Sequence, residues 1–122
     1  MAKILAVDDS RSMREMVKSV LQLEGHEVWV AEDGVEALKF ARENVVDVVL
    51  SDINMPNMNG ISLVAKLRRV ESYANTPIVM LTTESSDYKK GKAKTMGADG
   101  WLQKPFDPER LIKAVNVMLT RS

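Results

Sequence analysis

Three aspartates and one lysine stand at the ends of apolar segments in this sequence of 122 residues. Asp8 and Asp9 directly follow the run ILAV, Asp52 ends the run VVLSD, and Lys104 follows WLQ. Two carboxylates that share a site repel each other by about 4 kcal/mol at about 4 Å and an effective dielectric constant of about 20. A cluster of carboxylates therefore costs free energy unless a cation binds to it. Mg²⁺ suits this role, because it binds one or two carboxylates and keeps several waters.

Asp52 is the candidate nucleophile, because it stands alone on its segment, whereas Asp8 and Asp9 are adjacent and suit metal binding. A carboxylate can attack phosphorus and form an aspartyl phosphate. The attack needs a metal to screen the repulsion between oxygens, and donors for the charge on the equatorial oxygens. Lys104 offers an ammonium, and Thr82, after the run IVML, offers a hydroxyl. The residue types therefore indicate phosphoryl transfer.

These residues need secondary structure that gathers them at one edge. Strand-like segments alternate with helix-like segments, the strands over residues 3–7, 27–31, 45–52, 76–82 and 100–104 and the helices over 10–25, 33–45, 60–72, 85–98 and 107–120. Five such units predict an α/β fold, a doubly wound parallel sheet with helices on both faces. Ligands of such sheets bind beyond the carboxyl ends of the strands, where the aspartates, Thr82 and Lys104 fall.

Helix boundaries have their own signals. Ser12 with Glu15 could form a capping box at the start of the first helix, and Gly25 stands where that helix should stop. Asp33, with Glu36 three residues later, marks the start of the second helix, and Asp107 before a proline marks the start of the last. The segment 85–98 is the weakest helix, because it has little apolar periodicity.

Composition narrows the function classes. Seventeen basic and seventeen acidic residues cancel, so no overall charge points to nucleic acid or to an anionic membrane. The chain has no cysteine, which excludes disulfides, thiolate metal sites and cysteine nucleophiles. It has no apolar run long enough to span a membrane and no signal-peptide pattern, so we expect a cytoplasmic protein of one domain.

Four motifs occur along the sequence in the order VDDS, SDINMPNMNG, MLTT and KPF. Together they resemble the receiver domain of bacterial two-component response regulators, and most of all the single-domain chemotaxis regulators of the CheY type. The resemblance implies a flavodoxin-like sheet of order 2-1-3-4-5 with five helices. It also implies that residues 1–122 form one receiver domain with no output domain, and we expect a monomer.

The resemblance also implies a role for each acidic residue. Asp52 would accept a phosphoryl group from a sensor histidine kinase of the CheA type. Mg²⁺ would be held by Asp9, Asp52 and the main-chain carbonyl of Asn54, with Asp8 acting through water. The protein would be a signalling phosphoacceptor rather than an enzyme, with intrinsic autophosphorylation and autodephosphorylation chemistry.

Thr82 and Lys104 would contact the phosphoryl group, and the Lys104-Pro105 peptide bond would be cis. The family's switch pairs the threonine with an aromatic residue of the fifth strand, which is Trp101 here and is usually tyrosine or phenylalanine. Inward rotation of this ring would alter the surface made by the fourth helix, fifth strand and fifth helix. Plain packing of Trp101 against a helix is the competing interpretation.

Three further residues would set the lifetime of the phosphoryl group. Asn54 and Glu84 resemble the pair of fast-resetting chemotaxis regulators, whereas Thr83 occupies a place where the family usually has alanine or glycine. The bulk of Thr83 could slow the access of phosphodonors or of water.

Partners follow from the same resemblance: a histidine kinase, a flagellar motor switch protein and a phosphatase. The alternative is a phosphorelay intermediate that passes its phosphoryl group to another histidine protein. A flavodoxin-like cofactor binder is disfavoured, because the acidic loop DDSRSM lacks glycine and cannot easily cradle a flavin phosphate. A phosphohydrolase that uses an aspartyl phosphate would need a substrate pocket and usually a cap, for which the chain has little room.

Overall fold

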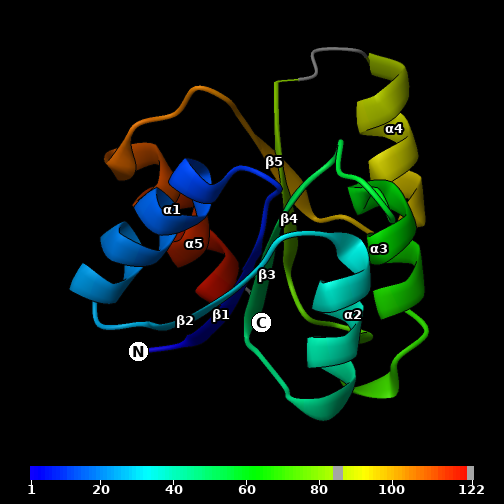
Figure 1. Cartoon of the computed structure of the whole chain (residues 1–122), viewed down its shortest axis with the longest axis horizontal. Coiled ribbons are helices and arrows are strands. Elements are labelled where there is room, and N and C mark those ends of the chain that lie inside the picture. The colour runs from blue at the N-terminus through cyan, green and yellow to red at the C-terminus, as the bar shows by residue number, and fades with distance from the viewer. Residues whose placement is uncertain (84–86, 121–122) are drawn as a thin grey trace.

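A computed structural model of the chain describes the backbone of residues 1–83 and 87–120, and the side chains of these residues except 87–90. Its centre is a sheet of five parallel strands (Figure 1): β1 Lys3–Val7, β2 Glu27–Ala31, β3 Val48–Asp52, β4 Ile78–Thr82 and β5 Gly100–Gln103. The strands lie in the order β2-β1-β3-β4-β5. The predicted doubly wound α/β sheet is confirmed, and so is the implied strand order.

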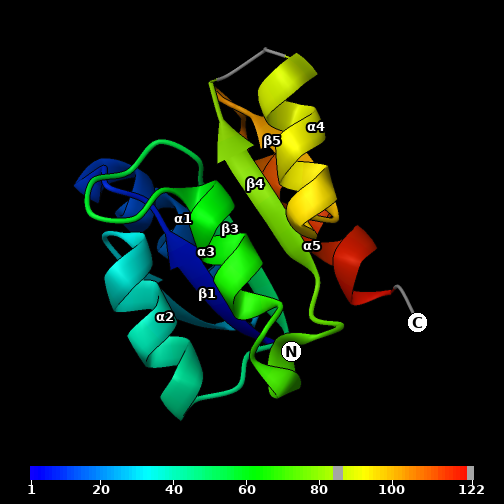
Figure 2. The same cartoon turned by 90° about the vertical axis from the view of Figure 1, so that its right-hand side faces the viewer.

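Five helices cover the two faces of the sheet (Figures 1 and 2). They are α1 Arg11–Leu23 and α5 Pro108–Leu119 on one face, and α2 Gly34–Glu43, α3 Gly60–Leu67 and α4 Asp87–Met96 on the other. Each face has its own apolar cluster, and β3 contributes to both because alternate side chains point in opposite directions. Val49 packs with α2, α3 and α4, and Leu50 packs with α1 and α5. No described helix has the length and apolar character needed to cross a bilayer.

Two helix boundaries differ from the prediction. The first helix is capped by Ser10 rather than Ser12, and the Ser10 hydroxyl accepts a hydrogen bond from the Met13 N–H at 3.3 Å. The Glu15 carboxylate pairs with Arg11 at 3.1 Å, so the predicted capping box is wrong. The expected stop holds, since Gly25 follows the helix with a φ of 89°.

The third helix is shorter than residues 60–72. It ends at Leu67, and the N–H groups of Arg69 and Val70 bond to the carbonyls three residues back, which tightens the last turn. A 3₁₀ turn over Glu71–Tyr73 follows. The caps predicted at Asp33 and Asp107 are confirmed, because their carboxylates accept from the N–H groups three residues later.

Arg68 joins three segments at the end of the sheet opposite the aspartates. Its half-buried guanidinium donates to the carbonyls of Tyr73 at 2.6 Å and Thr76 at 2.7 Å, and to that of Gly97 at 2.7 and 3.1 Å. It also pairs with Asp99 at 2.9 Å. Gly97 has a φ of 117°, and a Cβ there would lie 2.8 Å from the Arg68 side chain, so this position requires glycine. Arg68 thus fixes the chain after α3 against the entry into β5.

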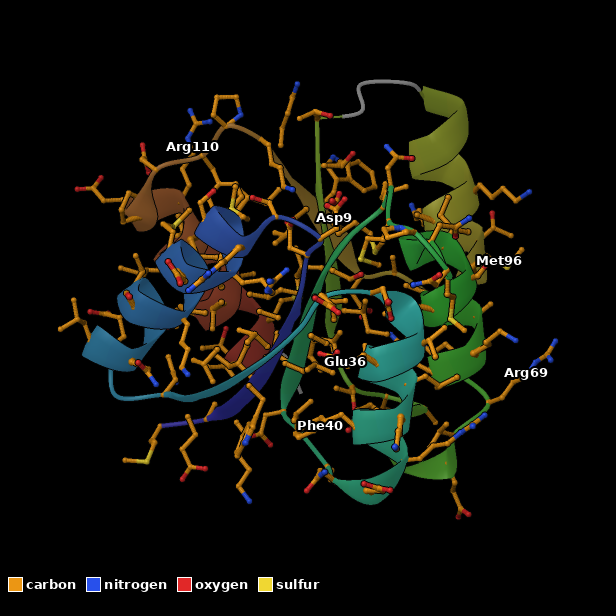
Figure 3. All side chains as sticks on the ribbon, viewed as in Figure 1. Asp9, Glu36, Phe40, Arg69, Met96 and Arg110 are labelled. Carbon is orange, nitrogen blue, oxygen red and sulfur yellow. The ribbon has the colours of Figure 1, made fainter. Side chains whose placement is uncertain are left out.

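We expect Arg68→Lys to lower the free energy of unfolding by about 2 kcal/mol or more, because an ammonium cannot reproduce this planar set of donors and leaves carbonyls unpaired. Denaturant unfolding measures the change. Arg69→Lys is the matched control, since Arg69 is the exposed neighbour (Figure 3) and should shift stability by less than about 0.5 kcal/mol. Equal effects of the two substitutions would contradict the assignment.

Candidate functional site

The carboxyl ends of four strands gather the predicted chemistry at one edge of the sheet. Asp8 follows β1, Asp52 ends β3, Thr82 ends β4, and Lys104 follows β5. The N–H of Lys104 donates to the carbonyl of Thr82 at 2.8 Å, which continues the β4–β5 pairing to the site. The Lys104-Pro105 peptide bond is cis, as the resemblance implies.

Asp8, Asp9 and Asp52 form a compact acidic cluster. One oxygen from each carboxylate can be chosen so that all three oxygens lie within 4.8 Å of one another. Asp8 and Asp52 are buried, whereas Asp9 is exposed at the upper end of the sheet (Figure 3). The cluster therefore has two desolvated carboxylates and one that faces solvent.

Lys104 supplies the positive charge of this edge. Its Nζ lies 2.6 Å from Oδ2 of Asp8 and 3.5 Å from Oδ2 of Asp52. The other oxygen of Asp8 accepts from the Ser10 N–H at 2.9 Å. Both oxygens of Asp8 are thus engaged, and the ammonium lies between the two buried carboxylates.

Asp52 is in an environment that disfavours its charge. Asp52 is the last residue of β3, a strand in which every residue is buried, and it is only 8% exposed. Burial raises the pKa of the Asp52 carboxyl, and the charges of Asp8 and Asp9 raise it further. The Lys104 ammonium and the hydrogen bond from the Ile53 N–H lower this pKa, but the balance stays upward. Asp52 is therefore a carboxylate with little solvation to lose.

Gly60 holds α3 tightly against the end of β3. Its N–H donates to the Ile53 carbonyl at 2.8 Å. A Cβ on Gly60 would collide with the Asp52 carbonyl oxygen and approach the Met80 side chain to 2.8 Å. This position requires glycine, because any side chain would push the helix away from the backbone of Asp52.

The loop between β3 and α3 is also tied to the start of α2. The Asn57 amide donates to Asp33 at 2.7 Å, and Asn57 has a φ of 67°. The Gly34 N–H donates to the Met58 carbonyl at 3.3 Å. The Glu36 N–H and the Asn57 amide both lower the pKa of the Asp33 carboxyl, so a charged cap stabilises this junction. The loop after Asp52 is consequently fixed at both of its ends.

Comparison with known proteins shows the family to which the chain belongs. The model of the response regulator receiver domain matches residues 4–116. The chain belongs to this family. Receivers bind Mg²⁺ at an acidic pocket, and the three hard oxygen ligands of the cluster fit such an ion.

Three relatives match this chain over most of its length and over most of their own. It shares 52% identity and a TM-score of 0.95 with the structure of the chemotaxis protein CheY4 of Vibrio cholerae, which covers 98% of this chain and 99% of that one. It is 37% identical to Protein PilH of Pseudomonas aeruginosa over 98% of each chain. It is 42% identical to a CheY homolog of Campylobacter jejuni over 89% of this chain and 85% of that protein.

Longer regulators match as well. The transcriptional regulatory protein CpxR of Escherichia coli is 38% identical over all 122 residues. The chain spans about half the length of that relative, 51%. A receiver of this sequence type therefore also occurs within larger proteins.

The structure also gives the exposure of other predicted residues of this receiver. Thr82 is buried, at 1% exposure, whereas Thr83 and Asn54 are exposed. Trp101 is 44% exposed on β5. Glu84 lies outside the described residues, so its place beside the phosphoacceptor stays a prediction, as does the carbonyl ligand at Asn54.

Sequence reasoning missed Arg14. This half-buried residue of α1 donates to the main-chain carbonyl of Asp8 at 2.8 Å and so helps to hold the first acidic residue in place. A signal was present, because Arg14 stands three residues before Val17 and seven before Leu21, on the buried side of the helix. A cation on an apolar stripe indicates a buried acceptor, which here is a carbonyl.

We expect Asp52→Asn to raise the free energy of unfolding by about 1 kcal/mol in a chelating buffer, because it removes a carboxylate from the cluster. The sign follows from the raised pKa, since a group whose pKa is higher in the folded state destabilises the fold once it is ionised. Added Mg²⁺ should reverse the order, because the wild-type chain binds the ion better. Denaturant midpoints at neutral pH measure the effect.

Asp47→Asn is the matched control, because Asp47 is the exposed aspartate just before β3 and lies far from the cluster along that strand. Its midpoint should rise with added Mg²⁺ as that of the wild type does, because the acidic cluster is intact. Asp9→Asn should act in the same direction as Asp52→Asn. If both substitutions lowered the midpoint without Mg²⁺, the acidic cluster would not be repulsive.

Proposed function

We propose that this receiver accepts a phosphoryl group on Asp52 from a sensor histidine kinase of the CheA type, and that the transfer depends on Mg²⁺. The observation that supports this most is the position of Asp52, a buried carboxylate of raised pKa within reach of two other aspartates and one lysine. An aspartate with a purely structural role would be expected to have more cations than anions beside it.

The chemistry of each residue follows from its contacts. A carboxylate oxygen of Asp52 forms the new bond to phosphorus, and the bond from phosphorus to the histidine nitrogen of the kinase breaks. Asp9, Asp52 and the carbonyl of Asn54 would hold the Mg²⁺, which would supply positive charge to offset the repulsion between oxygens during the transfer. Both oxygens of Asp8 already accept hydrogen bonds, which favours its action through water.

Lys104 and Thr82 would receive the transferred group. The ammonium of Lys104 lies between Asp8 and Asp52, so it can keep its pair with Asp8 and donate to a phosphoryl oxygen on Asp52. Thr82 ends the strand next to Asp52 in the sheet, where its hydroxyl can turn towards the same group. Asn54, Thr83 and Glu84 would then set how fast water removes the phosphoryl group, alone or with a phosphatase.

The acceptor is tested by incubation with acetyl phosphate with and without Mg²⁺, followed by prompt measurement of intact mass. We expect a labile gain of one phosphoryl group that needs Mg²⁺, and no gain for Asp52→Asn. Asp47→Asn is again the control and should be labelled as the wild type is. Labelling of Asp52→Asn at the wild-type level would place the acceptor elsewhere.

A slow or absent adduct has its own test. Beryllium fluoride binds as a stable analogue of the phosphoryl group, so a change in the amide spectrum around Asp52 should appear even if the adduct is short-lived. Without a change, the protein would be a receiver-shaped binding module rather than a phosphoacceptor. Thr83 would then be the first residue to substitute, because its bulk could block the site.

We further propose that Trp101 reports the phosphoryl group to the output surface of α4, β5 and α5. Trp101 is the partner of Met80 in the β4–β5 register, and Met80 and Thr82 share one face of β4 because they are two residues apart. Trp101 and Thr82 therefore lie on the same face, towards α4. Trp101 is 44% exposed, so an inward turn of its ring when the hydroxyl moves would remove apolar surface from water.

Tryptophan fluorescence in Trp29→Phe isolates Trp101. Trp29 is a suitable residue to replace, because it packs against Phe40 on α2, away from the switch, at 5.7 Å between ring centroids. We expect beryllium fluoride with Mg²⁺ to shift the Trp101 emission to shorter wavelength as the ring becomes buried, and Thr82→Ala to reduce the shift. An unchanged spectrum in the presence of bound beryllium fluoride would mean that Trp101 only covers the sheet.

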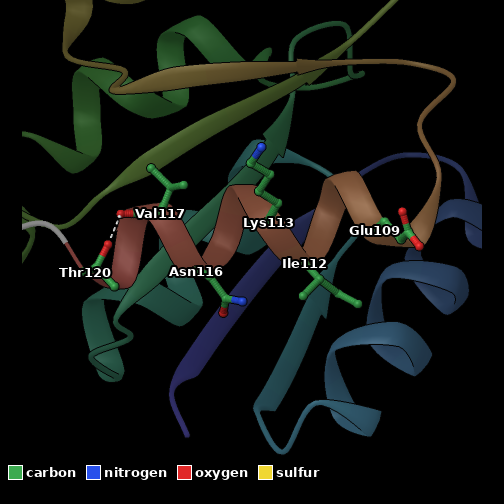
Figure 4. Close-up of a pocket in the computed structure, with 6 residues that line it drawn as sticks. All are labelled: Glu109, Ile112, Lys113, Asn116, Val117 and Thr120. Atoms are coloured by element: carbon green, nitrogen blue, oxygen red, sulfur yellow. Dashed lines mark hydrogen bonds between the residues drawn. The ribbon is translucent and has the colours of Figure 1, made fainter.

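The partner of the output surface is proposed from the relatives. The chemotaxis proteins of Vibrio and Campylobacter favour binding to a flagellar motor switch protein. The fifth helix offers a shallow hollow of about 420 Å³ along its outer side (Figure 4), lined by Glu109, Ile112, Lys113, Asn116, Val117 and Thr120. Transfer of label from Asp52 to a second histidine protein would instead support the relay.

A further inference from the structure

A groove runs between α2 and α3, two helices that lie side by side on one face of the molecule (Figure 2). It encloses about 410 Å³. It contains none of the acidic residues of the phosphoacceptor site, and it lies outside the surface of α4, β5 and α5. The function proposed above therefore leaves it without a role.

The floor of the groove is apolar. It is made by Val35 and Leu38 of α2 and by Met58 of the loop before α3. Leu38 is almost wholly buried, whereas Val35 is 51% exposed, one of the few aliphatic side chains that the fold leaves so open. An occupant that covers Val35 and Met58 would gain the free energy of removing this surface from water.

The rim of the groove is basic. Lys39 and Arg42 project from α2 and Lys66 from α3, against the single carboxylate of Glu43. All three cations are exposed, and among the described residues none of them makes an ion pair. The excess of positive charge is local, because the chain as a whole has a net charge of zero.

We propose that this groove docks an acidic segment of a partner protein, with an apolar side chain that enters between α2 and α3. The apolar floor and basic rim complement such a segment in both polarity and charge. A second copy of this chain would bring the same positive rim and be repelled. A flat membrane surface would not reach the floor of a groove between two convex helices.

The probe for this proposal is a synthetic amphipathic peptide of sixteen residues, with leucines on one helical face and glutamates elsewhere. Its binding is measured by fluorescence anisotropy at low salt, and its position by amide shifts of the labelled protein. We expect shifts within residues 35–43 and 58–66. The double variant Lys39→Glu/Lys66→Glu should lose affinity by about tenfold or more, because two rim charges are reversed.

The matched control is Lys3→Glu/Lys18→Glu, which makes the same change of charge on the exposed surfaces of β1 and α1. It should change the affinity by less than about twofold, because these lysines lie outside the groove. Val35→Ser tests the floor separately and should weaken the peptide without changing the salt dependence of binding. All of these residues are exposed, so the variants should keep the fold, which circular dichroism checks.

Several results would overturn the proposal. They are equal loss of affinity in the two charge-reversed variants, amide shifts outside the groove, and no binding of the peptide at about millimolar concentration. Equal binding of a peptide with scrambled leucines would show that the apolar floor does not contribute to the affinity. Self-association that disappears in Lys39→Glu/Lys66→Glu would show that a second copy occupies the groove. None of these measurements uses phosphorylation, so they are independent of the acceptor at Asp52.

Discussion

The repulsion among three carboxylates at one end of the sheet is the constraint on which the rest of this structure depends. Asp8 directly follows β1 and Asp52 ends the neighbouring strand β3, so their proximity is a direct result of the pairing of β1 with β3. Lys104 comes from the far edge strand and lies between them. One ammonium cannot neutralise three carboxylates, and burial raises the pKa of Asp52 despite it. The fold must therefore supply, elsewhere, the free energy that this edge costs.

That free energy comes from parts of the chain that have no role in the chemistry. Two apolar clusters cover the two faces of the sheet, and the strands β3 and β4 are buried along their whole length. At the opposite end, Arg68 satisfies three carbonyls and one carboxylate with a single guanidinium. Close to the site, Gly60 and Asn57 fix the loop after Asp52. The acidic cluster is thus held by rigid neighbours on both sides of its central strand.

The sequence predicts the parts of this arrangement that depend on pattern. Alternating segments predict the sheet, and polar residues at strand ends predict the edge at which Asp52 and Lys104 meet. It does not predict contacts to main-chain carbonyls, since any residue can supply a carbonyl and none is marked by its type. For this reason the sequence does not identify the carbonyl partners of Arg14 and Arg68, although the place of Arg14 on an apolar stripe is a signal that it has a buried acceptor. Ser12 was chosen over Ser10 because both fit a cap, and only the path of the chain decides between them.

The same reasoning explains why a small chemical change at Asp52 can act at a distance. A phosphoryl group on Asp52 would add negative charge where two buried carboxylates already share the Lys104 ammonium, so it would attract every hydrogen-bond donor within reach. The N–H groups of Ser10 and Ile53 belong to the backbone and already donate to the aspartates. Thr82 has a hydroxyl that can rotate, and Trp101 shares its face on an edge strand with part of its ring exposed. An edge strand has a neighbour on one side only, so the response can be larger there than in the centre of the sheet, where packing permits little rearrangement.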